Sequence, residues 1–266
     1  MLHRKPTLDD GSAVITGLLL GLNLPSNLPV GIVILGAVVA IGIGKMTFGG
    51  LGCNLFNPAL VGRCMLLVSF PVQMTSWPVV GQQMSYTDAT TGATPLSLMK
   101  KAISSGDASV LDSMPSSLHL LLGNNVNGGA GTIGEVCALA LLLGLAFMLW
   151  KKIITWHIPV SIILSAFVFA SVLHIANPIY ADPMSVVLTG GMMLGAIFMA
   201  TDYTTSPMTR RGQLIYGTAI GLLTIVIRNW GAYPEGMSFA ILIMNAFTPL
   251  INNYCKPKRF GEVLKK

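Results

Sequence analysis

Residues 158–176, IPVSIILSAFVFASVLHIA, form an apolar run that contains no charged residue. A helix of about 20 such residues spans the ~30 Å hydrocarbon core of a bilayer. Only 10% of the whole chain is charged and its mean hydropathy is +0.70, whereas about 25% of the residues of a soluble domain are charged. The shortage of charge predicts an integral membrane protein.

Similar runs recur along the chain and predict an all-α integral membrane fold, a polytopic helix bundle of about eight membrane segments. The runs cover 12–24, 30–47, 55–70, 131–150, 158–176, 184–201, 212–228 and 237–254. The first run stops early, before a proline, and the third opens at Asn57-Pro58. Both features predict broken or tilted helices, which a membrane protein tolerates where neighbouring groups satisfy the freed backbone.

The basic residues predict the orientation of these helices. With a cytoplasmic N-terminus, the 16 lysines and arginines fall on the inner face, except for Lys100, Lys101, Arg228 and the helix-borne Arg63. Such an excess marks the cytoplasmic side. The chain is therefore predicted to divide into a first membrane repeat (1–70), an extracytoplasmic loop (71–130), membrane helices with a second repeat (131–254) and a cytoplasmic basic tail (255–266). Within the loop, only a short helix near 94–103 is expected.

An internal repeat is indicated by three matches that occur in the same order. GLLLG at 17–21 matches GMMLG at 191–195, and each follows an aspartate-bearing lead. The next helix ends in a cation, an aromatic residue and glycine, with Lys45 in one copy and Arg228 in the other. The copies lie five segments apart, so they are predicted to be inverted, with a pathway at their interface. Chance resemblance between glycine-rich helices is the alternative explanation.

Four ionisable residues fall in or near the predicted helices: Arg63, Glu135, Asp202 and Arg228. Charge within a membrane is costly and commonly functional. Asp202 and Arg228 lie near helix ends, where snorkelling to the interface explains them equally well. We hypothesise a midplane constriction at the broken helices, where Arg63 or Asp202 affects the charge on a passing ion or a cofactor.

The stretch YTDATTGATPLS at 86–97 is polar and lies in the predicted outer loop. A turn would explain its glycine, because glycine adopts positive φ without strain. Alternatively, Gly92 and Ala93 leave the hydroxyl of Thr94 unhindered, so that an external enzyme could attach a group to it.

The segment DATTGATPL (88–96) resembles the flavinylation signature Asp-x-x-[Ser/Thr]-Gly-Ala-Thr of the RnfD and NqrB family of membrane subunits. The resemblance extends to FGGLGCNLFNPALVGR (48–63), SFPVQMTSWP (69–78) and GAIFMATDYTTSP (195–207). It implies that a flavin transferase joins FMN to Thr94 as a phosphoester. Asp88, Thr91, Gly92 and Ala93 would form the rest of the attachment motif. The sequence does not decide whether the chain also binds a second, non-covalent flavin such as riboflavin.

The same resemblance implies a function and a setting. The chain would be a membrane subunit of an ion-translocating ferredoxin:NAD oxidoreductase (Rnf) complex in a bacterial or archaeal cytoplasmic membrane. It would relay electrons across the bilayer, coupled to Na⁺ or H⁺ translocation, with the other Rnf complex subunits (A, B, C, E and G) as partners. Family members have two further N-terminal helices, ten in all, so the first repeat is expected to be incomplete in this chain.

The sequence also excludes several activities for this chain alone. It has no nicotinamide-binding fingerprint, no cysteine spacing typical of a metal or iron–sulfur site, and no basic-aromatic patch for nucleic acid. Two alternatives to the redox function stay open: an inverted-repeat channel or secondary transporter without a redox role, and a structural subunit whose flavin motif is unused.

Overall fold

The computed structural model describes residues 10–78, 92–123 and 131–256, and helices are the regular structure within these ranges. The N-terminal group comprises α1 (Ser12–Leu22), α2 (Val30–Val38) with its π-helical continuation η2 (Val39–Met46), α3 (Pro58–Ser69) and α4 (Pro71–Met74). The middle group comprises α5 (Pro95–Ser105), η3 (Ala108–Ser113), α6 (Ser117–Leu122) and η4 (Ile133–Glu135). The C-terminal group comprises α7 (Ala138–Trp150), α8 (His157–Ala176), α9 (Pro183–Leu188), α10 (Met192–Leu194), η5 (Gly195–Met199), α11 (Arg210–Trp230) and α12 (Met237–Tyr254).

Each of the predicted segments contains helix, and the differences have local causes. The segment expected at 131–150 starts as an α-helix only at Ala138, after the 3₁₀ turn η4. The segment expected at 184–201 is interrupted between α9 and α10, where Gly190 has a φ of 68°. Such a φ suits glycine, which has no Cβ. The loop predicted to hold one short helix contains α4 and α6 in addition to α5.

The start of α3 follows directly from its sequence. The side chain of Asn57 accepts hydrogen bonds from the amides of Ala59 and Leu60, and Pro58 occupies the first helical position. Asparagine as the cap and proline in the first turn are a favoured combination, because they use positions whose amides have no partner inside the helix. The capped helix begins inside the protein, since Asn57 is only 3% exposed.

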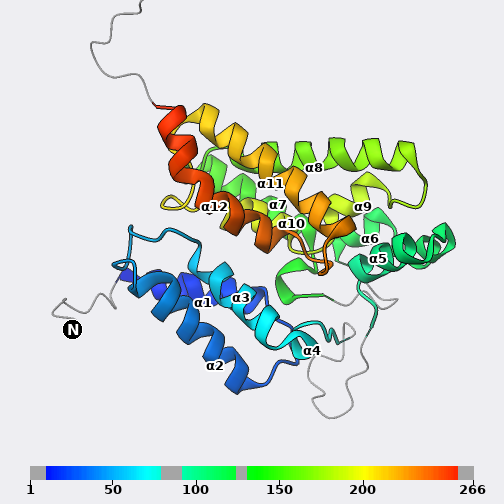
Figure 1. Ribbon diagram of the computed structural model, residues 1–266, viewed down its shortest axis with the longest axis horizontal. Helices are drawn as coiled ribbons and strands as arrows, with labels where there is room; N and C mark the ends of the chain where they lie inside the picture. Colours follow the sequence, from blue (N-terminus) through cyan, green and yellow to red (C-terminus); the bar gives the residue numbers. More distant parts are fainter. Residues whose placement is uncertain (1–9, 79–91, 124–130, 257–266) are drawn as a thin grey trace, which may run out of the picture.

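The helices form two packed groups that meet across the centre of the molecule (Figure 1). Helices α8, α11 and α12 lie together on one side, and α1, α2 and α3 lie on the other. One hydrophobic core cluster draws residues from both groups, including Leu20, Leu60, Ile162, Tyr216 and Ile241. A second cluster joins α6, α7, α9 and α10 to α8 and α11. The two groups therefore share one interior.

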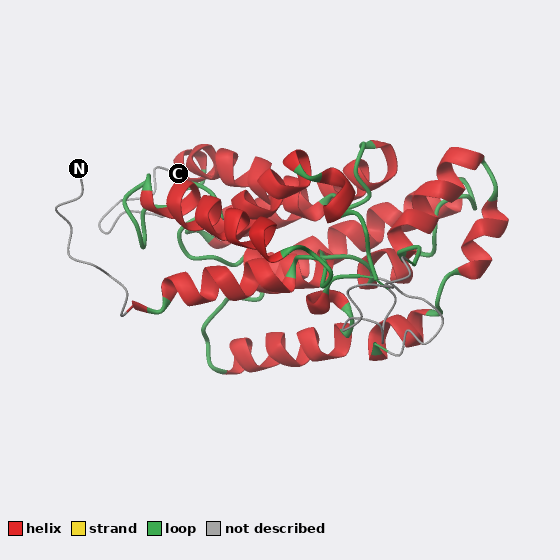
Figure 2. Ribbon diagram, turned by 90° about the horizontal axis from the view of Figure 1, so that it is seen from below, coloured by secondary structure: helices red, strands yellow, loops and turns green. Residues whose placement is uncertain are grey.

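The ends of the described chain lie near the same end of the helix bundle, as Figures 1 and 2 both show. Helices α5 and α6 lie at the opposite end (Figure 1). Of the described helices, α8 alone is long and apolar enough to cross a bilayer by length and composition. It also exposes an apolar face, with Leu164, Val168, Val172 and Ile175 more than half exposed. Shorter apolar helices cover 12–22, 30–46, 58–69 and 138–150.

Helices α8 and α11 approach closely because α11 presents glycine to its neighbour. A Cβ at Gly217 would overlap Oγ of Ser161, and one at Gly221 would lie 2.6 Å from the carbonyl oxygen of Ile162. By contrast, a Cβ at Gly17 of α1 would meet no atom within 4 Å. The close approach therefore requires glycine in α11 and not at this position of α1.

Replacing Gly221 with leucine should force α8 and α11 apart and destabilise the protein by about 1–3 kcal/mol or more, the usual cost of overpacking. The matched variant Gly17→Leu should leave the thermal unfolding temperature unchanged or slightly raised. Both temperatures can be measured in detergent by differential scanning fluorimetry. Equal unfolding temperatures for the two variants would contradict the packing described for α11.

Candidate functional site

Thr94 caps helix α5 and is held in place by its neighbours. Its Oγ1 accepts a hydrogen bond from the amide of Ser97 at 3.1 Å, and Pro95 follows as the first helical residue. Two residues earlier, the amide of Gly92 donates to the carbonyl oxygen of Trp77 at 3.0 Å. Asp88 and Thr91 of the predicted motif lie outside the described residues. The described part of the motif is thus anchored at both ends.

A small pocket of about 20 Å³, with room for about one water molecule, lies beside Thr94, and several distant segments form its wall. Thr94 and Trp77 line it, together with Glu135, Gly190 and Glu235. Thr94 itself is 9% exposed. The residue that the sequence singled out in an outer loop therefore contacts a space shared with two carboxylates.

Arg63 connects four separate parts of the chain. It is 3% exposed, and its Nη1 donates to Oδ1 of Asn23 at 2.8 Å and to Oγ of Ser238 at 2.9 Å. Its Nη2 forms an ion pair with Glu235. Its Nε is buried without a hydrogen-bond partner among the described residues. The guanidinium of α3 therefore joins the end of α1, α12 and the loop that precedes α12.

Arg228, near the end of α11, is buried as well, at 5% exposed. Its Nη1 donates to the carbonyl oxygen of Val186 at 2.6 Å, and its Nη2 donates to that of Thr189 at 2.9 Å. These carbonyls lie at or beside the end of α9, where helical carbonyl groups lack partners within the helix. The position of Arg228 near the end of α11 made snorkelling to the membrane interface one explanation for its charge. In the structure its side chain instead points into the protein, where carbonyl oxygens at the end of α9 accept its hydrogen bonds.

The interruption between α9 and α10 lies among these charges. A Cβ at Gly191 would lie 3.4 Å from Nη1 of Arg63 and 3.4 Å from Oε1 of Glu135. A Cβ at Gly190 would lie 2.8 Å from Nη2 of Arg228. Side chains at these two positions would crowd the charged groups, so the two glycines allow both arginines to approach the break.

Glu135 has an incompletely satisfied carboxylate. Its Oε1 is buried and has no hydrogen-bond partner in the described part of the chain, although Arg63 and Arg228 both act on it electrostatically. A buried polar atom without a partner costs about 1–3 kcal/mol. Such an atom points to a group that completes the site when it is present.

Asp202, the other predicted pathway residue, lies apart from this cluster. Its Oδ2 accepts hydrogen bonds from the hydroxyls of Thr204 and Thr205 at 2.9 and 3.2 Å. The carboxylate therefore stabilises its own turn, a common local role for aspartate.

The structure brings Arg63 together with Glu135, Arg228 and Glu235 instead of Asp202. Glu235 was not singled out in the sequence, because it lies in a short loop outside the apolar runs. Its position just before the last apolar run could have indicated a functional role. Only 10% of this chain is charged, so a carboxylate at the start of a membrane segment is uncommon.

The two predicted repeat copies share a pattern of hydrogen bonds. In the first copy, Oγ1 of Thr16 donates to the carbonyl oxygen of Ser12 at 3.0 Å, and Lys45 donates to Oγ of Ser12. In the second copy, Oγ1 of Thr189 donates to the carbonyl oxygen of Ser185 at 2.6 Å. Arg228 again contacts the same helical segment through Thr189. The same threonine bond also occurs at Thr201, Thr224 and Thr248, and the two cations contact different kinds of acceptor, so the inverted repeat stays a prediction.

Removing the partner of Arg63 should be more harmful than removing the whole ion pair, because an isolated buried charge is the costly state. Glu235→Ala should destabilise the protein by about 3–5 kcal/mol. The double variant Arg63→Met with Glu235→Ala should recover part of that loss. Thermal unfolding of the wild type, both single variants and the double variant measures the coupling, and strictly additive losses would show that the pair does not interact.

The chain matches known proteins over nearly its whole length. Residues 1–261 match the NQR2, RnfD, RnfE family. One relative, from Acetobacterium woodii, is the D component of a Na⁺-translocating ferredoxin:NAD⁺ oxidoreductase complex; it is 47% identical, over 98% of this chain and 76% of the relative. The D component of the proton-translocating ferredoxin:NAD⁺ oxidoreductase complex of Clostridium ljungdahlii is 41% identical, over 98% and 78%.

A third relative has a more general name. The D component of the ion-translocating oxidoreductase complex of Klebsiella pneumoniae is 40% identical, over 98% of this chain and 81% of the relative. Because the family match covers almost every residue and these identities exceed 30%, the chain belongs to the NQR2, RnfD, RnfE family.

Proposed function

We propose that this chain is the D component, a membrane subunit, of an ion-translocating ferredoxin:NAD⁺ oxidoreductase complex, and that it carries FMN covalently on Thr94. The names of its relatives in Acetobacterium woodii and Clostridium ljungdahlii support the first part. One of these relatives is named for Na⁺ and the other for protons, so the coupling ion of this chain is Na⁺ or H⁺. The chain acts within the complex, together with the other Rnf complex subunits (A, B, C, E and G).

The observation that carries the flavin proposal is the position of Thr94 in its attachment motif and beside a pocket. The hydroxyl lies at the helix cap, and the pocket next to it contains Glu135 and Gly190. Among the described residues, the unpartnered Oε1 of Glu135 and the unpartnered Nε atoms of Arg63 and Arg228 offer an acceptor and donors to a polar group. Acceptors and donors are the two kinds of group that hydrogen-bond to the edge of a flavin ring, although Arg63 and Arg228 line neighbouring pockets and not the one at Thr94.

FMN would supply the electron-transfer chemistry, and the protein would supply its position and electrostatic surroundings. Thr94 would hold the phosphate end near the cap of α5. Trp77 and Pro95 would shield the pocket from water, since Trp77 is 8% exposed and Pro95 is buried. A group held in this place would lie close to the buried side chains of Arg63 and Arg228. Its charge would therefore interact electrostatically with both guanidinium groups beside the break between α9 and α10.

The proposed setting is a bacterial or archaeal cytoplasmic membrane, with both ends of this chain on the cytoplasmic side. The basic residues favour that orientation, and α5 and α6 lie at the end of the bundle opposite to the described chain ends (Figure 1). In this arrangement Thr94 lies on the outer side, where a flavin transferase reaches it.

The broken helix between α9 and α10 favours one alternative, an inverted-repeat channel or transporter without a redox role. Both functions use the charged residues around the break, but only the redox function requires a flavin on Thr94. A direct test of that attachment therefore separates them.

In cells that possess the flavin transferase, the wild-type chain should fluoresce as a band under ultraviolet light after denaturing electrophoresis. Thr94→Ala should abolish the fluorescence, because the ester oxygen is removed. The control Ser97→Ala, one helical turn away, should keep it. A dark wild-type band would favour the transporter, and a fluorescent Thr94→Ala band would place the flavin on another residue.

Arg63→Ala in the complete complex should impair ion transport or electron transfer by at least about tenfold, because it removes a buried charge beside the break. Electron transfer from ferredoxin to NAD⁺ and ion uptake into vesicles measure the two activities. The fluorescent band and the subunit composition of the purified complex serve as controls for folding. Wild-type rates of both activities would remove Arg63 from the pathway.

A further inference from the structure

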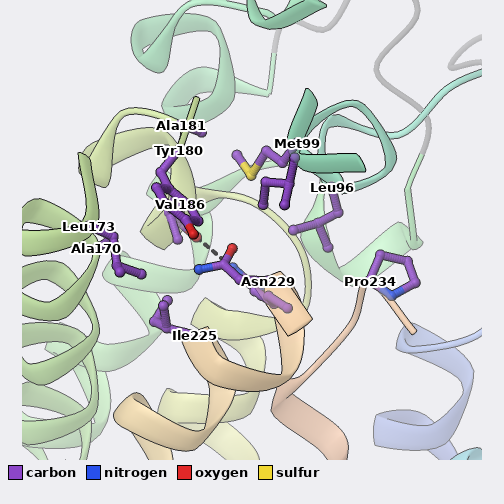
Figure 3. Close-up of a pocket in the computed structure, with 12 residues that line it drawn as sticks. Leu96, Met99, Ala170, Leu173, Tyr180, Ala181, Val186, Ile225, Asn229 and Pro234 are labelled. Atoms are coloured by element: carbon purple, nitrogen blue, oxygen red, sulfur yellow. Dashed lines mark hydrogen bonds between the residues drawn. The ribbon is translucent and has the colours of Figure 1, made fainter. Parts of the chain in front are cut away.

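An open groove of about 570 Å³ runs along the outer side of α8 and α11. It is much larger than the pockets at Thr94, Arg63 and Arg228, which measure about 20 Å³ each. Figure 3 shows the pocket at Arg228, which Ala170 and Leu173 line from the inner side of α8. A space of about 20 Å³ holds about one water molecule, whereas binding sites for small molecules measure about 300–1,000 Å³. The groove is therefore large enough for a ligand.

Two stripes of apolar side chains form the walls of the groove. Val160, Leu164 and Val168 line it from α8, and Leu214 and Leu222 line it from α11. Residues four positions apart lie on the same face of a helix. The wall on α11 is about 12 Å long, at a rise of about 1.5 Å per residue, which is close to half of the ~30 Å hydrocarbon core. The groove between its two walls is thus about as long as one leaflet is deep.

The floor of the groove offers no free polar group to a partner helix. The hydroxyls of Ser161 and Ser165 donate to carbonyl oxygens of their own helix, at 3.0 and 3.1 Å. Helices in membranes pack against one another mainly through small residues, but Gly217 and Gly221 already face α8 at close distance. What remains accessible is mostly valine and leucine, a surface that suits a flexible acyl chain better than the backbone of another helix.

One end of the groove is basic. Arg210 and Arg211 are the first residues of α11 and are exposed. They precede Leu214 by four and three positions, so they continue the stripe that lines the groove. Neither arginine forms an ion pair with a carboxylate among the described residues. Asp202, which lies in the turn before α11, accepts hydrogen bonds from two threonine hydroxyls of its own turn. The two guanidinium groups are therefore available to an anion.

A second pair of cations lies at the same end. Oγ1 of Thr155 donates to Oε1 of Gln213 at 2.9 Å, which places the segment that follows Lys151 and Lys152 beside the first turn of α11. Trp156, which is 52% exposed, lines the groove there. Tryptophan is enriched at membrane interfaces. The groove thus leads from an apolar interior to a basic interface, on the side predicted to be cytoplasmic, where basic sites between membrane helices bind anionic headgroups.

We propose that this groove binds an anionic phospholipid, with one acyl chain between α8 and α11 and the phosphate at Arg210 and Arg211. A guanidinium pairs with phosphate through two parallel hydrogen bonds, and the length of the groove matches one leaflet. A ligand that binds only the folded protein stabilises it, so the lipid would stabilise the contact between these two helices. The inference requires that α8 and α11 lie in the bilayer and does not depend on a flavin at Thr94.

The test uses the complete complex in phosphatidylcholine vesicles that contain a minor fraction of phosphatidylglycerol. One of the two lipids carries bromine near the headgroup end of an acyl chain, because bromine quenches tryptophan fluorescence on contact. Subtracting the signal of the Trp156→Phe complex isolates Trp156, which lines the groove. Brominated phosphatidylglycerol should quench Trp156 at least about fivefold more effectively than an equal fraction of brominated phosphatidylcholine, the factor expected for one basic side chain at a membrane surface.

The double variant Arg210→Gln with Arg211→Gln should remove this preference, because the phosphate loses its partners. Lys101→Gln removes an exposed charge from α5, at the other end of the bundle, and should keep the preference. Equal quenching by the two lipids in the wild type, or a preference that survives in the double variant, would overturn the proposal. So would a lack of quenching by either lipid, because a partner helix would then cover the groove.

A filling variant tests the groove separately from its charge. Thr218 is exposed and lines the groove, so Thr218→Phe fills the space between the walls and leaves the arginines in place. Quenching by brominated phosphatidylglycerol should then fall to the level of brominated phosphatidylcholine. An undiminished preference in an assembled Thr218→Phe complex would show that the lipid is attracted by surface charge alone and that its chain does not occupy the groove.

Discussion

The high cost of burying charge is the constraint on which the rest of this structure depends. Arg63 and Arg228 are both at least 95% buried, and each can stay charged only if polar groups from other elements reach it. Arg63 obtains these from α1, α12 and Glu235. Arg228 obtains them from the carbonyl oxygens at the end of α9. The two guanidinium groups therefore fix the relative positions of helices that are far apart in the sequence.

The break between α9 and α10 provides what Arg228 needs. A continuous helix would use the carbonyl groups near Thr189 in its own hydrogen bonds, whereas an interrupted helix leaves them free. Breaks of this kind are tolerated in membrane proteins where protein groups satisfy the exposed backbone. The guanidinium of Arg228 donates hydrogen bonds to carbonyl oxygens that the helix break leaves without partners. The same carbonyl oxygens stabilise the buried charge of Arg228. Each feature explains why the other is stable.

The sequence was sufficient for the parts of the fold that depend on hydrophobicity and local chemistry. The apolar runs predicted where helices occur, and Asn57-Pro58 marked the start of α3 because capping is local. Glu235 could not be recognised as part of the site, since its role depends on Arg63, which lies far away in the sequence. The direction of the Arg228 side chain could not be predicted either, because it follows from the place where a distant helix breaks. The motif predicted Thr94 as a candidate, but only the fold brings it beside Glu135.

The two predicted repeat copies differ at the place where the helix of the second copy breaks. The first copy reads Ser12-AVI-Thr16-Gly17-LLLG and the second reads Ser185-VVL-Thr189-Gly190-Gly191-MMLG, so the second has one additional glycine. In the first copy α1 runs unbroken through Thr16, and Lys45 contacts the hydroxyl of Ser12. In the second copy the helix stops before the glycine pair, and the corresponding cation contacts backbone carbonyls. The additional glycine thus accompanies the helix break that supplies carbonyl oxygens to Arg228.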